Sequence, residues 1–155
     1  MMTNNDCEGY GPRPANNNLT PRMFVYGTLR PGGSLNFHMD GNAYVGPASL
    51  AGYKMVDTGH GFPTIFKTGV GADVVVGDVY ILTGDTEATL RRLDRLEGEG
   101  QMYDRLPARA LLLASMVTRP VQVYVHREDF PFSADWNPEE VPGGDWQKLH
   151  PPVIV

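Results

Sequence analysis

The chain has 155 residues, of which 41% are apolar and 20% are charged, and its formal net charge is −5. The acidic balance and the lack of any basic run argue against nucleic acid or an anionic membrane as a partner. No stretch approaches the roughly 20 consecutive apolar residues of a membrane span. The polar N-terminus does not look like a signal peptide, so we expect a cytoplasmic protein.

Residues 1–20 are polar and rich in Asn, Gly and Pro, which predicts a flexible N-terminal tail. Residues 21–155 contain no internal repeat and no linker, and their length suits one domain with its own core. The 18 glycines and 13 prolines of the chain favour short strands with many turns over a helical bundle.

The sequence offers little for a metal site or a covalent nucleophile. Cys7, the only cysteine, excludes an internal disulfide and has no His or basic neighbour that would activate its thiol. The serines lack a Gly-x-Ser-x-Gly context. The histidines lack the spacing of metal ligands; they are His38, His60, His126 and His150. We therefore predict no metal, and the pattern indicates no particular oligomeric state.

Residues 23–33 read Met-Phe-Val-Tyr-Gly-Thr-Leu-Arg-Pro-Gly-Gly, a short buried strand that runs into a tight glycine turn. Such a turn can direct several backbone N–H groups the same way, which makes a site for an anion or oxyanion without a basic side chain. The alternative is a turn that binds nothing, and this stretch alone leaves both interpretations open.

The rest of the chain predicts strands around one helix. We expect a helical turn over residues 35–40 with Ser34 as its N-cap, and strands over 47–56, 62–67 and 73–82. Gly77 marks a bulge or the close approach of another backbone. After a helix over 85–97, strands follow over 103–114 and 118–125, with Met116 in the turn between them. From His126 onward we expect an irregular segment that packs on the body through its aromatic residues: Phe130, Phe132, Trp136 and Trp146. This order predicts an α+β fold, a small, mixed but mostly antiparallel β-barrel with one main flanking helix.

Glu97 is the residue that least fits its helix. Asp85 caps the start of this helix and Gly98 ends it, and Leu90, Leu93 and Leu96 form its buried stripe. Glu97 points between Leu90 and Leu93, and a carboxylate aimed at a core is costly without a role or a partner. Burial and the negative end of the helix dipole would raise its pKa toward the range of a general acid/base. The alternative is a frayed last turn that swings Glu97 outward.

Two of these stretches together resemble the gamma-glutamylcyclotransferase-like family, which includes gamma-glutamylamine cyclotransferases and plant avirulence-induced relatives. The first is Tyr26-Gly27-Thr28-Leu29 after an apolar strand, and the second is Leu93-Asp94-Arg95-Leu96-Glu97-Gly98 followed by Tyr103. Shorter matches support it: Gly52-Tyr53, Phe62-Pro63, Val76-Gly77-Asp78-Val79-Tyr80, Val123-Tyr124-Val125 and Gly144-Asp145-Trp146.

The resemblance implies an enzyme without metal or cofactor that acts on a gamma-glutamyl amine or peptide. The substrate's own α-amine attacks its γ-carbonyl, and 5-oxoproline and a free amine are released. In this chain the implied proton shuttle is Glu97, and Tyr103 lines the pocket near it. Backbone groups hold the glutamyl part; they belong to Tyr26, Gly27, Thr28 and Leu29. Further wall residues are Pro63, Tyr124 and Trp146.

Two other interpretations remain open. The first is a catalytically silent module that binds a small molecule or a protein in the same pocket. The second is a related amide-processing enzyme of a biosynthetic pathway that uses the same residues on a larger substrate. Fold resemblance does not by itself establish turnover, and the sequence does not name the amine.

Overall fold

The computed structural model describes residues 21–98, 100–132 and 136–151, and in these ranges five strands close into a barrel in the order β1-β5-β2-β6-β7. Their bounds are Arg22–Val25 (β1), Ala43–Ala51 (β2), Val74–Ile81 (β5), Tyr103–Leu112 (β6) and Val117–His126 (β7). β1 and β7 pair in parallel, and the other neighbours pair antiparallel. The mixed, mostly antiparallel barrel is confirmed. The predicted tail, residues 1–20, lies outside the described residues.

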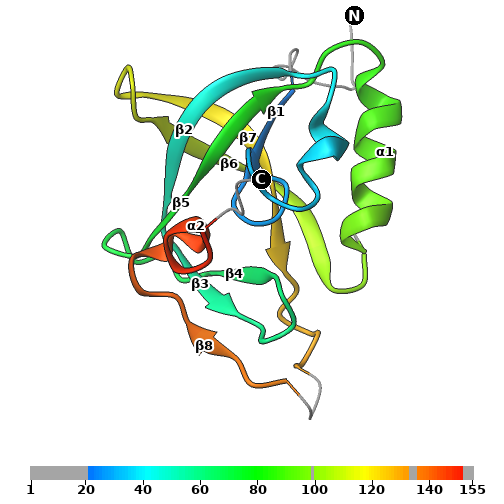
Figure 1. The fold of residues 1–155 in the computed structure, drawn as a ribbon. Coiled ribbons are helices and arrows are strands. Elements are labelled where there is room, and N and C mark those ends of the chain that lie inside the picture. The colour runs from blue at the N-terminus through cyan, green and yellow to red at the C-terminus, as the bar shows by residue number, and fades with distance from the viewer. Residues whose placement is uncertain (1–20, 99, 133–135, 152–155) are drawn as a thin grey trace, which may run out of the picture.

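A smaller antiparallel sheet lies beside the barrel, below it in the view of Figure 1. Its described strands are Pro63–Lys67 (β4), Tyr53–Asp57 (β3) and Glu139–Glu140 (β8), in the order β4-β3-β8. Pro63 is the first residue of β4, as its missing N–H requires. The prediction of one strand over residues 47–56 is wrong. Gly52, with φ of 90°, separates β2 from β3 and sends the chain from one sheet into the other.

The one main helix, α1 (Thr86–Glu97), packs on the side of the barrel (Figure 1). Its predicted ends are confirmed: the Asp85 carboxylate accepts from the N–H of Ala88 at 3.0 Å, and Gly98 adopts the left-handed conformation at φ 68°. Leu93 is fully buried. The prediction that Leu96 is buried with it is wrong, because Leu96 is 37% exposed and faces the cavity described below.

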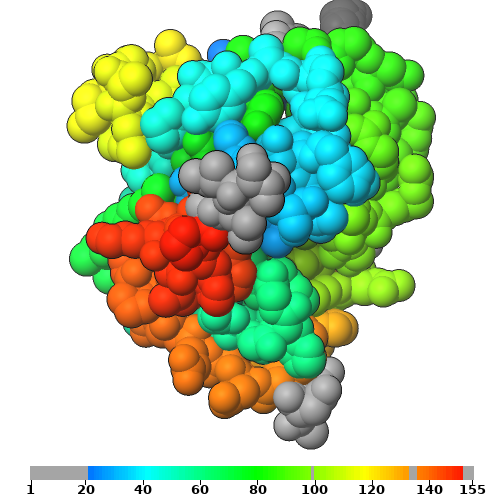
Figure 2. Space-filling model, viewed as in Figure 1, coloured from blue at the N-terminus to red at the C-terminus, as the bar shows by residue number. Residues whose placement is uncertain are grey.

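Short segments complete the fold. The turn η3 (Asn36–Met39) follows β1, but Ser34 does not cap it, since Leu35 stands at the N-cap position without a side-chain cap. Figure 2 shows this segment, in light blue, packed against α1, in yellow-green; the Arg92 guanidinium donates to the carbonyl of His38 at 2.8 Å.

The C-terminal part of the described chain contains η4 (Pro142–Gly144) and α2 (Trp146–Leu149). The aromatic residues of this part pack on the body as predicted, with Trp146 only 6% exposed and Phe132 against Phe66. His126 differs from the prediction, because it is the buried last residue of β7 rather than part of the irregular segment. Met116 lies in the β6–β7 turn as predicted, with φ of 59°.

Two cores meet at the end of β1, and this junction positions the site. Phe24 packs into the barrel interior, whereas Met23 and Val25 point toward α1, as alternation along a strand dictates. The predicted close approach at Gly77 is confirmed, since a Cβ there would collide with the carbonyl oxygen of Val25. Among the described residues, no helix is long and apolar enough to cross a membrane.

Candidate active site

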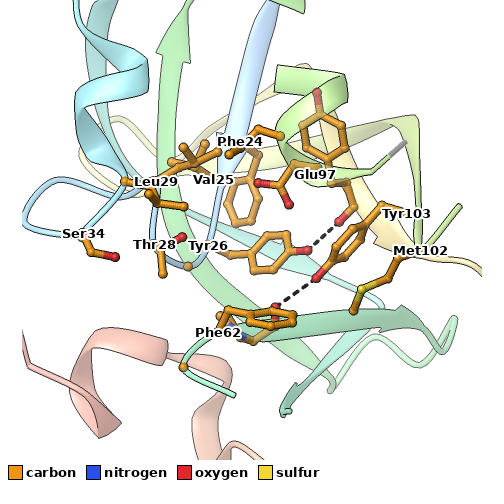
Figure 3. Close-up of a pocket in the computed structure, with 16 residues that line it drawn as sticks. Phe24, Val25, Tyr26, Thr28, Leu29, Ser34, Phe62, Glu97, Met102 and Tyr103 are labelled. Atoms are coloured by element: carbon orange, nitrogen blue, oxygen red, sulfur yellow. Dashed lines mark hydrogen bonds between the residues drawn. The ribbon is translucent and has the colours of Figure 1, made fainter. Parts of the chain in front are cut away.

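A cavity of about 360 Å³ opens where the two cores meet, at the end of β1 (Figure 3). A volume of this size lies within the usual range of small-molecule sites. It is surrounded by the end of β1 and the turn that follows, the start of β4, the end of α1, the start of β6 and Tyr124 of β7. The six residues predicted for the site all line this one cavity: Tyr26, Gly27, Thr28, Leu29, Glu97 and Tyr103. Pro63 and Tyr124 line it as well, whereas Trp146 is not among its lining residues.

Residues 26–29, called here the 26–29 turn, form one wall. Its backbone is held from within, because Arg30 N–H donates to the carbonyl of Gly27 at 3.1 Å and Leu35 N–H donates to that of Thr28 at 3.0 Å. No acceptor for the N–H groups of Thr28 and Leu29 occurs in the part of the chain that the structure describes. Unpaired backbone donors beside a cavity are suited to a carboxylate or to a developing oxyanion.

Arg30 fixes this turn to the barrel and was missed by the sequence analysis. Its guanidinium is buried and pairs with the Asp78 carboxylate of β5 at 2.8 Å and with Asp145 before α2 at 2.9 Å. The Tyr44 hydroxyl donates to the same Asp78 at 2.6 Å. The only sign of this ion pair in the sequence is Asp78, a charged residue in the middle of the clearest predicted strand. Because all these charges are paired, the arrangement holds the turn rather than offering a charge to a ligand.

Glu97 forms the opposite wall. It is the last residue of α1, and its carboxylate points into the cavity rather than outward (Figure 3). No ion pair or hydrogen bond compensates this carboxylate among the described residues. Burial raises its pKa from 4.5 to about 7. A carboxyl group with this pKa both accepts and returns a proton near neutral pH.

The last turn of α1 is clamped, which explains why Glu97 does not fray outward. Asp94, three residues earlier, accepts from the Arg105 guanidinium at 2.8 and 3.1 Å and from the Tyr124 hydroxyl at 2.7 Å. Burial opposes the ionisation of Asp94, but the hydrogen bonds from Arg105 and Tyr124 outweigh it, and the pKa of this carboxyl is lowered. The charged clamp joins the helix end to β6 and β7.

Two phenols lie beside Glu97, and both donate their protons to backbone carbonyls. The Tyr26 hydroxyl donates to the carbonyl of Tyr124 at 2.7 Å, and the Tyr103 hydroxyl donates to the carbonyl of Pro63 at 3.2 Å, as dashed in Figure 3. Burial raises the pKa of both phenols, so they stay neutral. Their oxygens and the Glu97 carboxylate therefore form a group of acceptors, which favours a ligand that brings N–H donors.

Apolar side chains make up part of the lining. Leu35, Phe62, Leu96 and Met102 lie there, each partly exposed. They were not predicted as site residues, because helical or strand periodicity does not distinguish an apolar residue in a core from one that lines a cavity. Among the described residues, no group of three or more His, Cys, Asp or Glu side chains could hold a metal ion.

The fold defined by this barrel and helix recurs in solved structures. One similar structure is that of an AIG2-like protein from Mus musculus, with 22% identity, a TM-score of 0.60, and coverage of 82% of this chain and 94% of that one. Another is that of a protein from Arabidopsis thaliana, with 23% identity, a TM-score of 0.61, and coverage of 87% and 85%. A third, an uncharacterised protein from Pyrococcus horikoshii, has 18% identity, a TM-score of 0.59, and coverage of 84% and 93%. At these identities the likeness establishes the fold alone.

The family follows from the sequence model that matches residues 23–148, described as gamma-glutamyl cyclotransferase, AIG2-like. The chain belongs to this family. It is also 37% identical over 93 residues to the gamma-L-glutamyl-butirosin B gamma-glutamyl cyclotransferase of Niallia circulans. That match spans 56% of this chain and only 55% of the relative, so the chain matches about half the length of this curated protein.

Proposed function

We propose that the protein is a gamma-glutamyl cyclotransferase, which converts a gamma-glutamyl amine or peptide into 5-oxoproline and a free amine. The observation that carries this proposal is that Glu97 lines the same cavity as the 26–29 turn, in which the N–H groups of Thr28 and Leu29 have no acceptor among the described residues. Family membership supports it, and so does the activity named for the relative from Niallia circulans.

The reaction needs no nucleophile from the protein. The α-amine of the glutamyl group attacks its own γ-carbonyl, a new C–N bond closes the five-membered ring, and the original amide C–N bond breaks. Holding the substrate in this folded pose converts the attack into a favoured unimolecular step. That suits a site in which the lining residues include no cysteine and no histidine.

Glu97 carries the proton in this proposal. In its ionised form it accepts a proton from the substrate α-ammonium, which frees the nitrogen lone pair for attack. It then returns that proton to the leaving amine, so the protons balance over one turnover. A pKa of about 7 makes both transfers accessible near neutral pH.

The remaining polar groups hold the substrate. The phenol oxygens of Tyr26 and Tyr103 accept N–H bonds from the α-amine beside Glu97. The N–H groups of Thr28 and Leu29 donate to the α-carboxylate or to the oxyanion that forms on the γ-carbonyl. The apolar part of the lining leaves room for the amine that departs.

A panel of gamma-glutamyl amines and gamma-glutamyl dipeptides tests the proposal, with 5-oxoproline measured by mass spectrometry. We expect protein-dependent release from at least one member of the panel. Absence of product across the panel would contradict the proposal. Stoichiometric binding of a panel member that is recovered unchanged would instead identify a silent binding module on the same fold.

A further inference from the structure

The described chain contains a buried histidine that the proposed reaction does not use. His126, at the end of β7, is 4% exposed and lies outside the cavity lining. Its Nε2 lies 2.8 Å from the carbonyl oxygen of Phe130, and its Nδ1 lies 2.9 Å from the hydroxyl of Thr64. The rings of Phe66 and Phe132 flank the imidazole at centroid distances of 4.6 and 5.2 Å. The imidazole is thus held on both nitrogens and by its neighbours.

For a neutral imidazole, these contacts determine the direction of each hydrogen bond. A carbonyl oxygen only accepts, so Nε2 of His126 carries the proton that it donates to Phe130. In the neutral ring Nδ1 then has a lone pair, and the Thr64 hydroxyl donates to it. Thr64 is fully buried, so no solvent competes for this bond.

Thr64 connects this arrangement to the cavity. It follows Pro63 directly, and the Pro63 carbonyl accepts from the Tyr103 hydroxyl at 3.2 Å (Figure 3). The Pro63 carbonyl and the Thr64 N–H belong to the same planar peptide group. The Thr64 side chain also contacts the Tyr103 hydroxyl directly. Anchoring Thr64 on His126 therefore restrains both this hydroxyl and the peptide group whose carbonyl takes its proton.

We propose that Thr64 and His126 are positioning residues for the Tyr103 hydroxyl. They hold it so that it donates its hydrogen bond to the Pro63 carbonyl and directs its oxygen lone pairs toward the substrate amine. The proposal rests on the proposed function for its effect on turnover. Without the anchor, the Tyr103 hydroxyl loses the restraint that Thr64 supplies, and its proton turns toward the cavity. A phenol that donates into the cavity no longer accepts an N–H bond from the substrate, so the reacting nitrogen is held less well.

A double-mutant cycle tests the effect on catalysis. Thr64→Val keeps the shape but removes the hydroxyl, and we expect kcat to fall about tenfold, the size of one lost hydrogen bond. Thr64→Ser restores the hydroxyl and should restore most of kcat. In a Tyr103→Phe background Thr64→Val should have almost no further effect on kcat, because the group that Thr64 positions is gone.

Thr89→Val, at another buried threonine outside the cavity lining, is the matched control and should retain wild-type kcat. Additive effects of Thr64→Val and Tyr103→Phe would overturn the proposal.

A second measurement does not depend on turnover. In ¹⁵N NMR of histidine-labelled protein, we expect His126 as the Nε2–H tautomer. In ¹H NMR, we expect the ring signals of Tyr103 to shift in Thr64→Val but not in Thr89→Val. An Nδ1–H tautomer, or unchanged Tyr103 signals, would overturn the positioning role even in an active enzyme. If the NMR results hold and no panel substrate releases 5-oxoproline, the proposed function fails while the Thr64–His126 anchor of Tyr103 stands.

Discussion

Gly27 lies directly against the ring of Pro63, and a Cβ at position 27 would lie 2.8 Å from both Cδ and Cγ of that proline. This contact joins the 26–29 turn to the start of β4, so two walls of the cavity touch each other through a residue without a side chain. The width of the cavity at this point depends on that missing side chain. Glycine is therefore required here by close packing and not by an unusual backbone angle.

Gly27→Ala should accordingly widen or distort the cavity. We expect a loss of about 1–3 kcal/mol in the free energy of unfolding, the usual effect of an added methyl group in a packed site, and at least a tenfold fall in 5-oxoproline release. Urea denaturation and the product assay measure the two effects. Gly71→Ala, at an open position where a Cβ meets no atom within 4 Å, should change neither quantity. A fully active Gly27→Ala variant would show that the contact does not shape the site.

Arg30→Met should destabilise the protein because it leaves Asp78 buried without its cation. We expect a loss of about 3 kcal/mol in the free energy of unfolding, and partial recovery in the double variant with Asp78→Asn. The matched control is Arg91→Met, which removes an exposed pair with Glu87 and should cost about 0.5 kcal/mol or less. Equal losses for Arg30→Met and Arg91→Met in urea denaturation would mean that burial of the pair is unimportant.

The helix and its glutamate could be predicted because the information is local. Leu93 and Glu97 are four residues apart on one helix, and Asp85 and Gly98 mark its ends. The same periodicity failed at Leu96, because α1 reaches the cavity at that point and the residue faces an opening instead of a core. The sequence of a helix does not show which parts of the fold surround its last turn.

The non-local features could not be predicted. Arg30 pairs with residues 48 and 115 positions away, and no spacing rule connects such residues. The break at Gly52 lies inside a stretch whose pattern is typical of one strand, and only the partner strands in the structure show that the chain changes sheet there. His126 was predicted to begin an irregular segment, because the strand pattern gives no sign of the hydrogen bonds that bury its ring.

Stability should depend on pH through Glu97 in a defined direction. Its folded pKa of about 7 lies above the ordinary value of 4.5, so between these values the folded state binds more protons than the unfolded state. The free energy of unfolding therefore decreases as pH rises from 4.5 to 7. Because Glu97 keeps some access to the cavity, we expect a contribution of about 1–3 kcal/mol.

Glu97→Gln isolates this contribution, since it removes the buried charge and keeps the shape. At pH 8 the variant should be more stable than the wild type by about 1–3 kcal/mol, and near pH 4.5 the difference should vanish. Thermal denaturation at both pH values measures it. A difference that is the same at both pH values would show that the ionisation of Glu97 is not the cause.

Activity should also depend on the ionisation of Glu97, but it should rise with pH where stability falls. Protonated Glu97 cannot accept a proton from the substrate, so kcat/KM should fall as pH decreases through about 7 and approach a plateau above pH 8. Initial rates of 5-oxoproline formation between pH 4 and 9 give this profile. An acidic limb near pH 4.5, the ordinary glutamate value, would contradict burial as the source of a functional pKa.

The most direct test of the account compares Glu97→Gln with Glu87→Gln, a substitution of an exposed glutamate in the first turn of the same helix. For a substrate that the wild type converts, we expect 5-oxoproline release by Glu97→Gln to fall by at least a hundredfold, the scale of general acid/base catalysis. The Glu87→Gln variant should retain the wild-type rate. Undiminished release by Glu97→Gln would contradict the claim that this carboxylate carries the proton.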